Sequence, residues 1–421
     1  MGFASSYLEK HSYYKNFITR EPVAGTSLIV VIPSFNEPDV LTSVKSLFNA
    51  DSPSFPVEVL VVVNSSQNSC QEIILQNRKT VTQLREWSSS YCHDNFMVYV
   101  LDVPSFPCKH AGAGFARKTG MDEAVSRFNQ LNNERGIIVS FDADSKCDRN
   151  YFTELEKCFS SREVKGCTIY FEHPPGSNIK CTPMGTAIIE YELYLRYFVQ
   201  AMRLAGFPYA FHTIGSCFAV NVKTYAAMGG MNRKTAGEDF YFLHKIFPLG
   251  NFTELNSTRV IPSSRISDRV PFGTGATMKR MVAGSLGELK TYPLQSFDNL
   301  SVLFSIVPEF FGTDTKGAKD IVDKLPACTG KYLKDNDFVN AVLQMNMHSA
   351  SLLSFRKRFF VWFNALRLLK FLNYTDKYSY DQPVTQAADS LLRRLNVPSA
   401  EEGCSLLQIY RDLQRKTIWK S

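Results

Sequence analysis

Gly136-Ile137-Ile138-Val139-Ser140-Phe141-Asp142-Ala143-Asp144 is the stretch that decides the fold. Its apolar run predicts a buried strand of a parallel sheet. Two carboxylates one residue apart follow where the strand ends, and open α/β sheets bind ligands at that edge. Because buried carboxylates are costly and repel each other, the pair predicts a divalent cation with a phosphorylated ligand. The alternative is that Asp142 or Asp144 caps the next helix.

Strands and helices alternate on both sides of this stretch. The run 27–33 predicts a buried strand that stops at proline, and apolar residues at helical spacing follow over 40–48. The same alternation predicts strands at 57–64, 96–103, 165–172, 215–222 and 252–261, the last at an edge, and helices at 68–87, 111–129, 182–205 and 238–248. This order predicts an α/β fold with a doubly wound, mostly parallel sheet.

Beyond about residue 290 helical periodicity replaces the strand-like runs. We therefore expect an N-terminal helical extension over 1–25, an α/β domain over 26–285 and a helical C-terminal region over 286–421. Within that region the segment 355–372 begins with a basic and aromatic run. A helix packed within the region is the favoured interpretation, and peripheral contact with a membrane surface is the alternative.

Bulk composition fits a globular protein and excludes several classes. The 421 residues are 44% hydrophobic and 21% charged, and no apolar run approaches the ~20 residues that span a bilayer. The net charge of +7 is too mild to indicate a nucleic-acid partner, and none is expected. Ten cysteines are scattered without a Cys-x-x-Cys pair, which argues against a zinc knuckle. We expect reduced thiols and a cytoplasmic protein, or one at the inner face of a membrane.

Polar residues end the first two predicted strands. Pro33, Ser34, Asn36 and Glu37 close the first strand, and Asn64 closes the second. Polar side chains and free backbone groups at this edge suit a nucleotide. The alternative is an ordinary turn and a helix cap.

Three further segments carry charges that suit a phosphorylated ligand or an acid–base step. The glycine-rich stretch 109–120, which opens the predicted helix 111–129, holds Arg117 and Lys118. These two residues offer cations to a diphosphate or are ordinary solvated and structural charges. Glu238-Asp239 opens another helix, either as a general base or as acids that complement the helix dipole. The polar segment 263–275, with Arg265 and Arg269, is interpreted as a phosphate clamp on a lid or as a surface loop.

The order of these motifs resembles the family 2 glycosyltransferases of the GT-A fold, over roughly residues 26–270. That family begins with a strand ending in Pro-x-x-Asn-Glu, places a metal-binding Asp-x-Asp after a central strand, and has a Glu-Asp at a helix start. The matching residues here are Pro33, Asn36, Glu37, Asp142, Asp144, Glu238 and Asp239. The stretch 114–120 is similar to the family's Gly-x-x-x-Ala-Arg-Asn-x-Gly segment, with Lys118 where asparagine is usual.

The resemblance implies metal-dependent transfer of a sugar from a UDP- or GDP-sugar to a hydroxyl of a carbohydrate or lipid-linked acceptor, in surface polysaccharide or glycolipid synthesis. Mn²⁺ or Mg²⁺ would be held by Asp144, and by Asp142 through water. Asp239 would be the base of an inverting reaction, with Glu238 positioning it. Donor-binding positions would be Pro33, Ser34, Asn36, Glu37, Asn64, Arg117, Lys118, Asp142, Arg265 and Arg269.

Two departures from the family pattern bear on the donor and on the product. Asn64-Ser65-Ser66 stands where the family often has an aspartate pair, so the base of the nucleotide stays open. The family's Gln-x-x-Arg-Trp segment is absent, which argues against a membrane-embedded polymer synthase. A retaining transferase and an inactive sugar-nucleotide-binding subunit are the alternatives. A nucleotidyltransferase is disfavoured because no Gly-rich basic loop follows the first strand.

Overall fold

The computed structural model describes residues 2–14, 17–109, 111–161, 163–174, 182–234, 237–266, 273–284, 288–375, 381–400 and 403–420. The chain divides into two compact units, and each is described by itself. Unit 1 comprises Met1–Pro174, Thr213–Lys279 and Gln414–Ser421, and unit 2 comprises Pro175–His212 and Arg280–Leu413. The units therefore differ from the linear boundaries expected from the sequence, because each is assembled from separate parts of the chain.

Unit 1 is built on an eight-stranded sheet in the order β3-β2-β1-β4-β7-β6-β8-β5. Its strands are β1 Leu28–Ser34, β2 Val57–Ser66, β3 Phe96–Phe106, β4 Ile137–Ser140, β5 Lys146–Cys147, β6 Gly166–Phe171, β7 Phe218–Asn221 and β8 Phe252–Ile261. Five of the seven residues in β1 are fully buried aliphatic side chains, as expected of a strand covered on both faces.

Most of the strands run parallel, which confirms the predicted α/β fold class. β1 pairs in parallel with β2 and β4, β2 with β3, and β6 with β8, while β7 is antiparallel to both β4 and β6. The expectation that 252–261 forms an edge strand is wrong. β8 lies between β6 and the two-residue β5, which forms the edge. The sequence signal of β5 is too short to predict.

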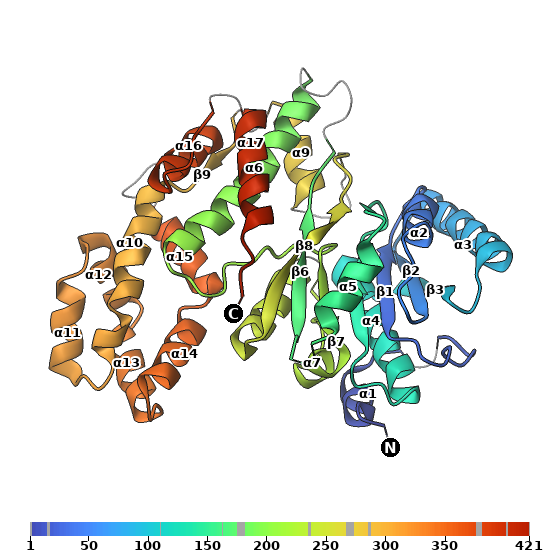
Figure 1. Ribbon diagram of the computed structural model, residues 1–421, viewed down its shortest axis with the longest axis horizontal. Helices are drawn as coiled ribbons and strands as arrows, with labels where there is room; N and C mark the ends of the chain where they lie inside the picture. Colours follow the sequence, from blue (N-terminus) through green and yellow to red (C-terminus); the bar gives the residue numbers. More distant parts are fainter. Residues whose placement is uncertain are drawn as a thin grey trace. The chain divides into compact units, whose positions relative to one another are not determined.

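Helices flank this sheet (Figure 1). Those of unit 1 are α1 Ser5–His11, α2 Val40–Phe48, α3 Gln71–Tyr91, α4 Ala113–Gln130, α5 Tyr151–Phe159, α7 Val222–Ala227, α8 Glu238–Ile246 and the short η2 Phe247–Leu249. α4 is tightly packed against the sheet, because a Cβ on Gly120 would lie 2.5 Å from Val31 and 2.9 Å from Val62. α9 Thr274–Val282 continues from unit 1 into unit 2.

The register of the parallel strands brings their carboxyl ends together. Ser34 of β1 stands opposite Val63 of β2, and Val31 of β1 stands opposite Ser140 of β4. The residues that follow β1, β2 and β4 therefore emerge at one edge of the sheet. This edge carries most of the residues that the sequence pattern singled out.

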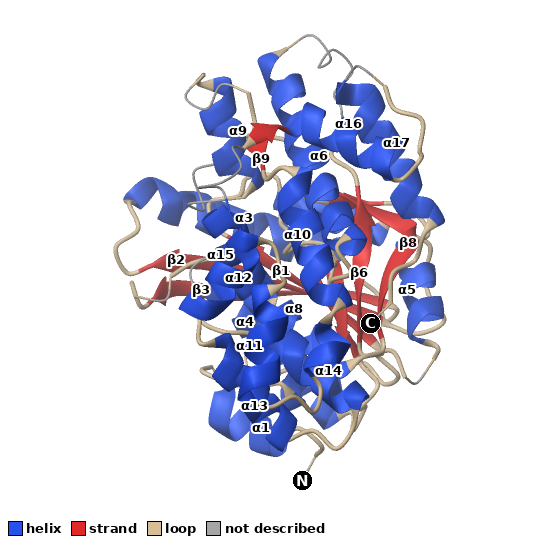
Figure 2. Cartoon of the chain, turned by 90° about the vertical axis from the view of Figure 1, so that its left-hand side faces the viewer, coloured by secondary structure: helices blue, strands red, loops and turns tan. Residues whose placement is uncertain are grey.

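Unit 2 is mainly helical (Figure 2), and its described residues also include one two-stranded antiparallel ribbon. Its elements are α6 Pro183–Leu204, β9 Lys290–Thr291, α10 Leu294–Ser305, η3 Val307–Phe310, α11 Thr315–Asp323, α12 Ala327–Asp335, α13 Phe338–Met347, α14 Leu352–Trp362, α15 Ala365–Thr375, β10 Gln382–Pro383 and α16 Val384–Arg394. Aromatic rings form much of its core; Phe304 contacts the rings of Phe359, Phe360 and Phe363. The expected helical C-terminal region is confirmed.

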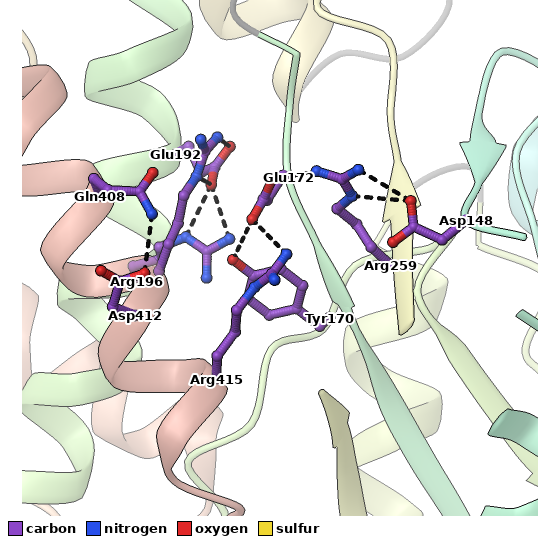
Figure 3. Close-up of polar contacts among 10 residues, drawn as sticks. Asp148, Tyr170, Glu172, Glu192, Arg196, Arg259, Gln408, Asp412 and Arg415 are labelled. Atoms are coloured by element: carbon purple, nitrogen blue, oxygen red, sulfur yellow. Dashed lines mark hydrogen bonds and ion pairs between the residues drawn. The ribbon is translucent and has the colours of Figure 1, made fainter. Parts of the chain in front are cut away.

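The last described helix, α17 Gly403–Lys416, contributes polar contacts to each unit (Figure 3). In unit 2 Arg411 donates to both carboxylate oxygens of Glu192 at 2.8 Å. In unit 1 Arg415 donates to Glu172 at 2.9 Å, and Tyr170 donates to the same carboxylate at 2.7 Å. Arg411 and Arg415 of α17 thus form ion pairs with buried or partly buried carboxylates.

Candidate active site

The first acidic pair lies on a turn directly after β4. Ser43 of α2 donates a hydrogen bond to the carbonyl of Ala143 at 2.8 Å, and the Ser145 amide donates to the Asp142 carbonyl at 3.1 Å. These two hydrogen bonds fix the backbone of the turn at Asp142 and Ala143. The side chains of Asp142 and Asp144 stay 37% and 28% exposed. They are accessible carboxylates on a fixed backbone, which favours a ligand site over simple capping.

Arg117 joins the first acidic pair to the second. Its Nη2 donates to Asp142 Oδ1 at 2.6 Å, and its Nη1 donates to Glu238 Oε1. The guanidinium is buried, with a side chain only 4% exposed. Burial alone lowers the pKa of Arg117, but the carboxylates of Glu238 and Asp142 outweigh it and raise that pKa overall. One permanently charged side chain therefore connects the ends of β4 and α8.

Two glycines make room for this connection. A Cβ on Gly215 would lie 2.8 Å from Nη2 of Arg117. A Cβ on Gly114, at the start of α4, would lie 2.9 Å from the Cβ of Glu238, and the Lys234 carbonyl would be closer still. α4 and α8 can therefore approach closely only because Gly114 has no side chain. This packing role of Gly114 and Gly215 was not predicted from the sequence.

The second acidic pair begins α8, after Gly237 in a left-handed conformation with φ 71°. Glu238 is buried against Arg117, whereas Asp239 is partly exposed. Burial, followed by the charge of Glu238, raises the pKa of Asp239 to about 7, although Arg117 and the Phe240 amide oppose the rise. A carboxyl group with that pKa can accept a proton near neutral pH.

Arg265 connects the end of β1 to the first acidic pair. Its Nη2 donates to Oε2 of Glu37, whose side chain is fully buried, and to Oδ2 of Asp144 at 3.2 Å. Oε1 of the same glutamate accepts the Asp39 amide at 3.1 Å. A cation from the loop after β8 thus lies beside Asp144. The structure brings Glu37, Asp144 and Arg265 together.

Asp142 and Asp144 can supply only some of the ligands that a divalent metal ion needs. Among the described residues no group of three or more His, Cys, Asp or Glu side chains could hold a metal ion. Mg²⁺ commonly takes one or two carboxylates and completes its shell with water and substrate phosphates. The accessible carboxylates of Asp142 and Asp144 suit that mode, in which the diphosphate brings the remaining ligands.

Two buried polar atoms at the ends of β1 and β2 have no hydrogen-bond partner within the described chain: the Ser34 hydroxyl and Oδ1 of Asn64. Asn77 of α3 fixes the loop beside them, since its side chain accepts the Asn36 amide at 3.0 Å and donates to the Asn64 carbonyl at 2.8 Å. Asn36 has φ 48°, a conformation that asparagine tolerates better than most residues. The free hydrogen-bonding capacity of Ser34 and Asn64 at this edge is available to a polar ligand or to water.

Asn77 was missed from the sequence. A signal was present in the sequence, because Asn77 is a polar residue at the helical spacing of Val81 and Leu84, and all three lie on the buried face of α3. Pro33 is half-buried within β1, where proline has no backbone N–H to donate. Arg269 lies outside the described residues.

Lys118 does not lie with the acidic pairs. Its ammonium contacts Asp122 Oδ2 at 2.8 Å and the Tyr7 hydroxyl at 3.3 Å. Tyr7 and Tyr225 both donate to the other oxygen of Asp122, at 2.6 and 3.0 Å. The expectation that this lysine contacts a diphosphate is not supported, since it is one helical position away from Arg117 and therefore lies on another face of α4. It anchors helix α1 instead.

The described helices include none that combines the length and apolar character needed to cross a membrane.

Comparison with known proteins gives similarities in structure alone. No family model and no curated protein matches the chain. Among solved structures, Staphylococcus aureus TarS 1–349 in complex with UDP-GlcNAc is 13% identical, over 80% of this chain and 91% of that one, with a TM-score of 0.40. GalNAc-T7 with UDP, GalNAc and Mn²⁺ is 13% identical over 67% of this chain and 50% of that one, with a TM-score of 0.36. At these values no residue role is transferred.

Proposed function

We propose that this protein is a GT-A glycosyltransferase that moves a sugar from a nucleotide diphosphate to an acceptor hydroxyl. The observation that carries the proposal is Arg117, which joins the accessible carboxylates after β4 to a helix start whose Asp239 has a pKa near 7. One acidic pair can serve a leaving group while the other serves a nucleophile. The family 2 motif order supports the same conclusion.

In this proposal the nucleotide lies along the carboxyl ends of β1 and β2. The unpartnered Ser34 hydroxyl and Asn64 amide oxygen would bind the base or ribose, with Asn36 shaping the loop. Asp144, and Asp142 directly or through water, would hold Mn²⁺ or Mg²⁺, which when bound neutralises charge on the departing diphosphate. Arg265 and Arg269 would also neutralise negative charge on the diphosphate.

Asp239 then accepts the proton of the acceptor hydroxyl. The acceptor oxygen attacks the anomeric carbon, the bond from that carbon to the diphosphate oxygen breaks, and the nucleoside diphosphate leaves with the electron pair. Attack from the face opposite the leaving group inverts the anomeric configuration. Glu238 and Arg117 act as positioning residues, because both are buried against each other and Arg117 is too enclosed to contact phosphate.

A UDP- or GDP-sugar is the proposed donor, and a carbohydrate or lipid-linked hydroxyl the acceptor, in surface polysaccharide or glycolipid synthesis at a cytoplasmic site. A retaining outcome is the second mechanism, and proton NMR of the product separates the two. An inactive sugar-nucleotide-binding subunit is the other alternative. The presence of both acidic pairs, with the pKa of Asp239 raised to about 7, supports catalysis over binding alone.

The test measures melting temperature with UDP-, GDP-, CMP- and dTDP-sugars plus Mn²⁺, followed by donor hydrolysis without acceptor. A true donor raises the melting temperature by mass action. Asp144→Ala and Asp239→Asn should each lose most turnover, and Asp239→Asn should keep donor binding. Asp102→Asn, an exposed change on β3, is the matched control. Near-normal rates in both site variants would refute the proposal.

A further inference from the structure

One segment of unit 2 has an unusual charge composition. From Phe338 to Thr375 there are five basic residues and no acidic residue, although the chain as a whole has 47 basic and 40 acidic residues. The five are Arg356, Lys357, Arg358, Arg367 and Lys370. Three of them are consecutive on α14, so the positive charge is concentrated on one helix.

Large apolar side chains are exposed on the same helix and on the turn before it. Met347 at the end of α13 is 73% exposed, Leu353 67% and Val361 56%. Leu353, Lys357 and Val361 follow each other at four-residue spacing, so they form one ridge along α14. Phe355 and Phe359 are buried on the opposite side. We call Met347, Leu353, Arg356, Lys357, Arg358 and Val361 the α14 face.

The cations of the α14 face have no acidic partner among the residues that the structure describes. Within the described chain no carboxylate forms an ion pair with Arg356, Lys357 or Arg358; Arg358 Nε instead donates to the His348 carbonyl at 3.0 Å, beside Met347. Other exposed lysines of unit 2 are interspersed with acids. On α11, for example, Lys319 is followed directly by Asp320. The α14 face therefore combines exposed aliphatic side chains with uncompensated positive charge.

We propose that the α14 face docks on an anionic lipid bilayer. Exposed aliphatic side chains can enter the boundary between headgroups and acyl chains, while flanking lysine and arginine side chains contact lipid phosphates. A second copy of the same face is disfavoured because it would bring three cations against three. Nucleic acid would neutralise the cations but leave Leu353 and Val361 without a partner. The proposal is independent of glycosyl transfer.

The test is co-sedimentation of the full-length protein with vesicles of phosphatidylcholine alone or with 30 to 40% phosphatidylglycerol, at about 0.1 and 0.5 M salt. Binding is expected with the anionic vesicles at low salt and weaker at high salt. Arg356→Gln/Lys357→Gln/Arg358→Gln should lower the partition coefficient about a hundredfold, since each such cation strengthens binding roughly fivefold. Leu353→Ser/Val361→Ser should lower it at both salt concentrations.

The matched control is Lys316→Gln/Lys319→Gln/Lys324→Gln, which removes the same charge from exposed positions of α11 and its end. It should retain binding within about threefold. Circular dichroism and thermal unfolding check that every variant is folded. The proposal is overturned if wild-type protein ignores anionic vesicles, or if the control loses as much binding as the α14 variant. It is also overturned if light scattering shows a dimer that Leu353→Ser/Val361→Ser dissociates.

Discussion

Replacing Arg117 by methionine tests the central electrostatic feature of the site. Methionine keeps much of the apolar length of the arginine side chain but lacks the buried guanidinium. The change therefore leaves Glu238, only 3% exposed, without its cation beside Asp239. Breaking a buried ion pair costs about 3–5 kcal/mol because one charge stays uncompensated. The Asp142 contact adds little, because that carboxylate is more than a third exposed and screened by water. We therefore expect a loss of about 3 kcal/mol.

The assay is urea unfolding at pH 6 and pH 8. The loss should be larger at pH 8, where Asp239 is ionised and Arg117 stabilises that charge, than at pH 6, where Asp239 is mostly protonated. The double variant Arg117→Met/Glu238→Gln should recover about 2 kcal/mol, since both charges of the buried Arg117–Glu238 pair are then removed. Arg135→Met, an exposed change, is the control. A loss below about 1 kcal/mol, or a double variant no more stable than the single one, would refute the reasoning.

Three further predictions follow from the same geometry. The folded-state pKa of Asp239 is raised to about 7, so ionising this carboxyl destabilises the folded protein, fully above pH 7 and progressively less as the pH falls towards 4. Asp239→Asn should therefore be more stable than wild type at pH 8, by on the order of 2 kcal/mol, and equally stable near pH 4. Thermal unfolding measured across this pH range checks the prediction. Arg265→Ala should destabilise by about 2 kcal/mol because it leaves the fully buried Glu37 without this partner, and a calorimetric loss under 0.5 kcal/mol would contradict that. Chelation with EDTA should abolish donor hydrolysis and added Mn²⁺ should restore it, whereas hydrolysis by Asp144→Ala should stay low at every Mn²⁺ concentration.

The sequence was sufficient to predict most strands of the sheet and the polar residues that follow three of them. Each apolar run predicts a strand, and the Pro33, Asn64 or Asp142 that follows it predicts where that strand ends. The antiparallel direction of β7 and the two-residue β5 were not predicted. Neither depends on local periodicity, because strand direction and edge pairing are set by contacts between distant segments.

The partners of the charged residues were harder to predict than their positions. Arg117 and Lys118 are neighbours in sequence, yet one joins both acidic pairs and the other anchors α1 through Asp122. A rotation of about 100° per residue around a helix separates them, and only the packing of α4 decides which face meets which partner. Asn77 was missed for a related reason, since its two hydrogen bonds reach backbone groups far away in sequence.

The end of the chain has a consequence for how the protein comes to be folded during synthesis. Residues 414–420 belong to unit 1, where the Trp419 amide donates to the nearly buried Glu254 at 3.1 Å and the side chain of Asn256 donates to the Gln414 carbonyl at 2.7 Å. β8 therefore receives these partners only after the ribosome has made all the helices of unit 2. Until then Glu254 and Asn256 lack these contacts, so this part of unit 1 is completed only after the intervening helices have been synthesised.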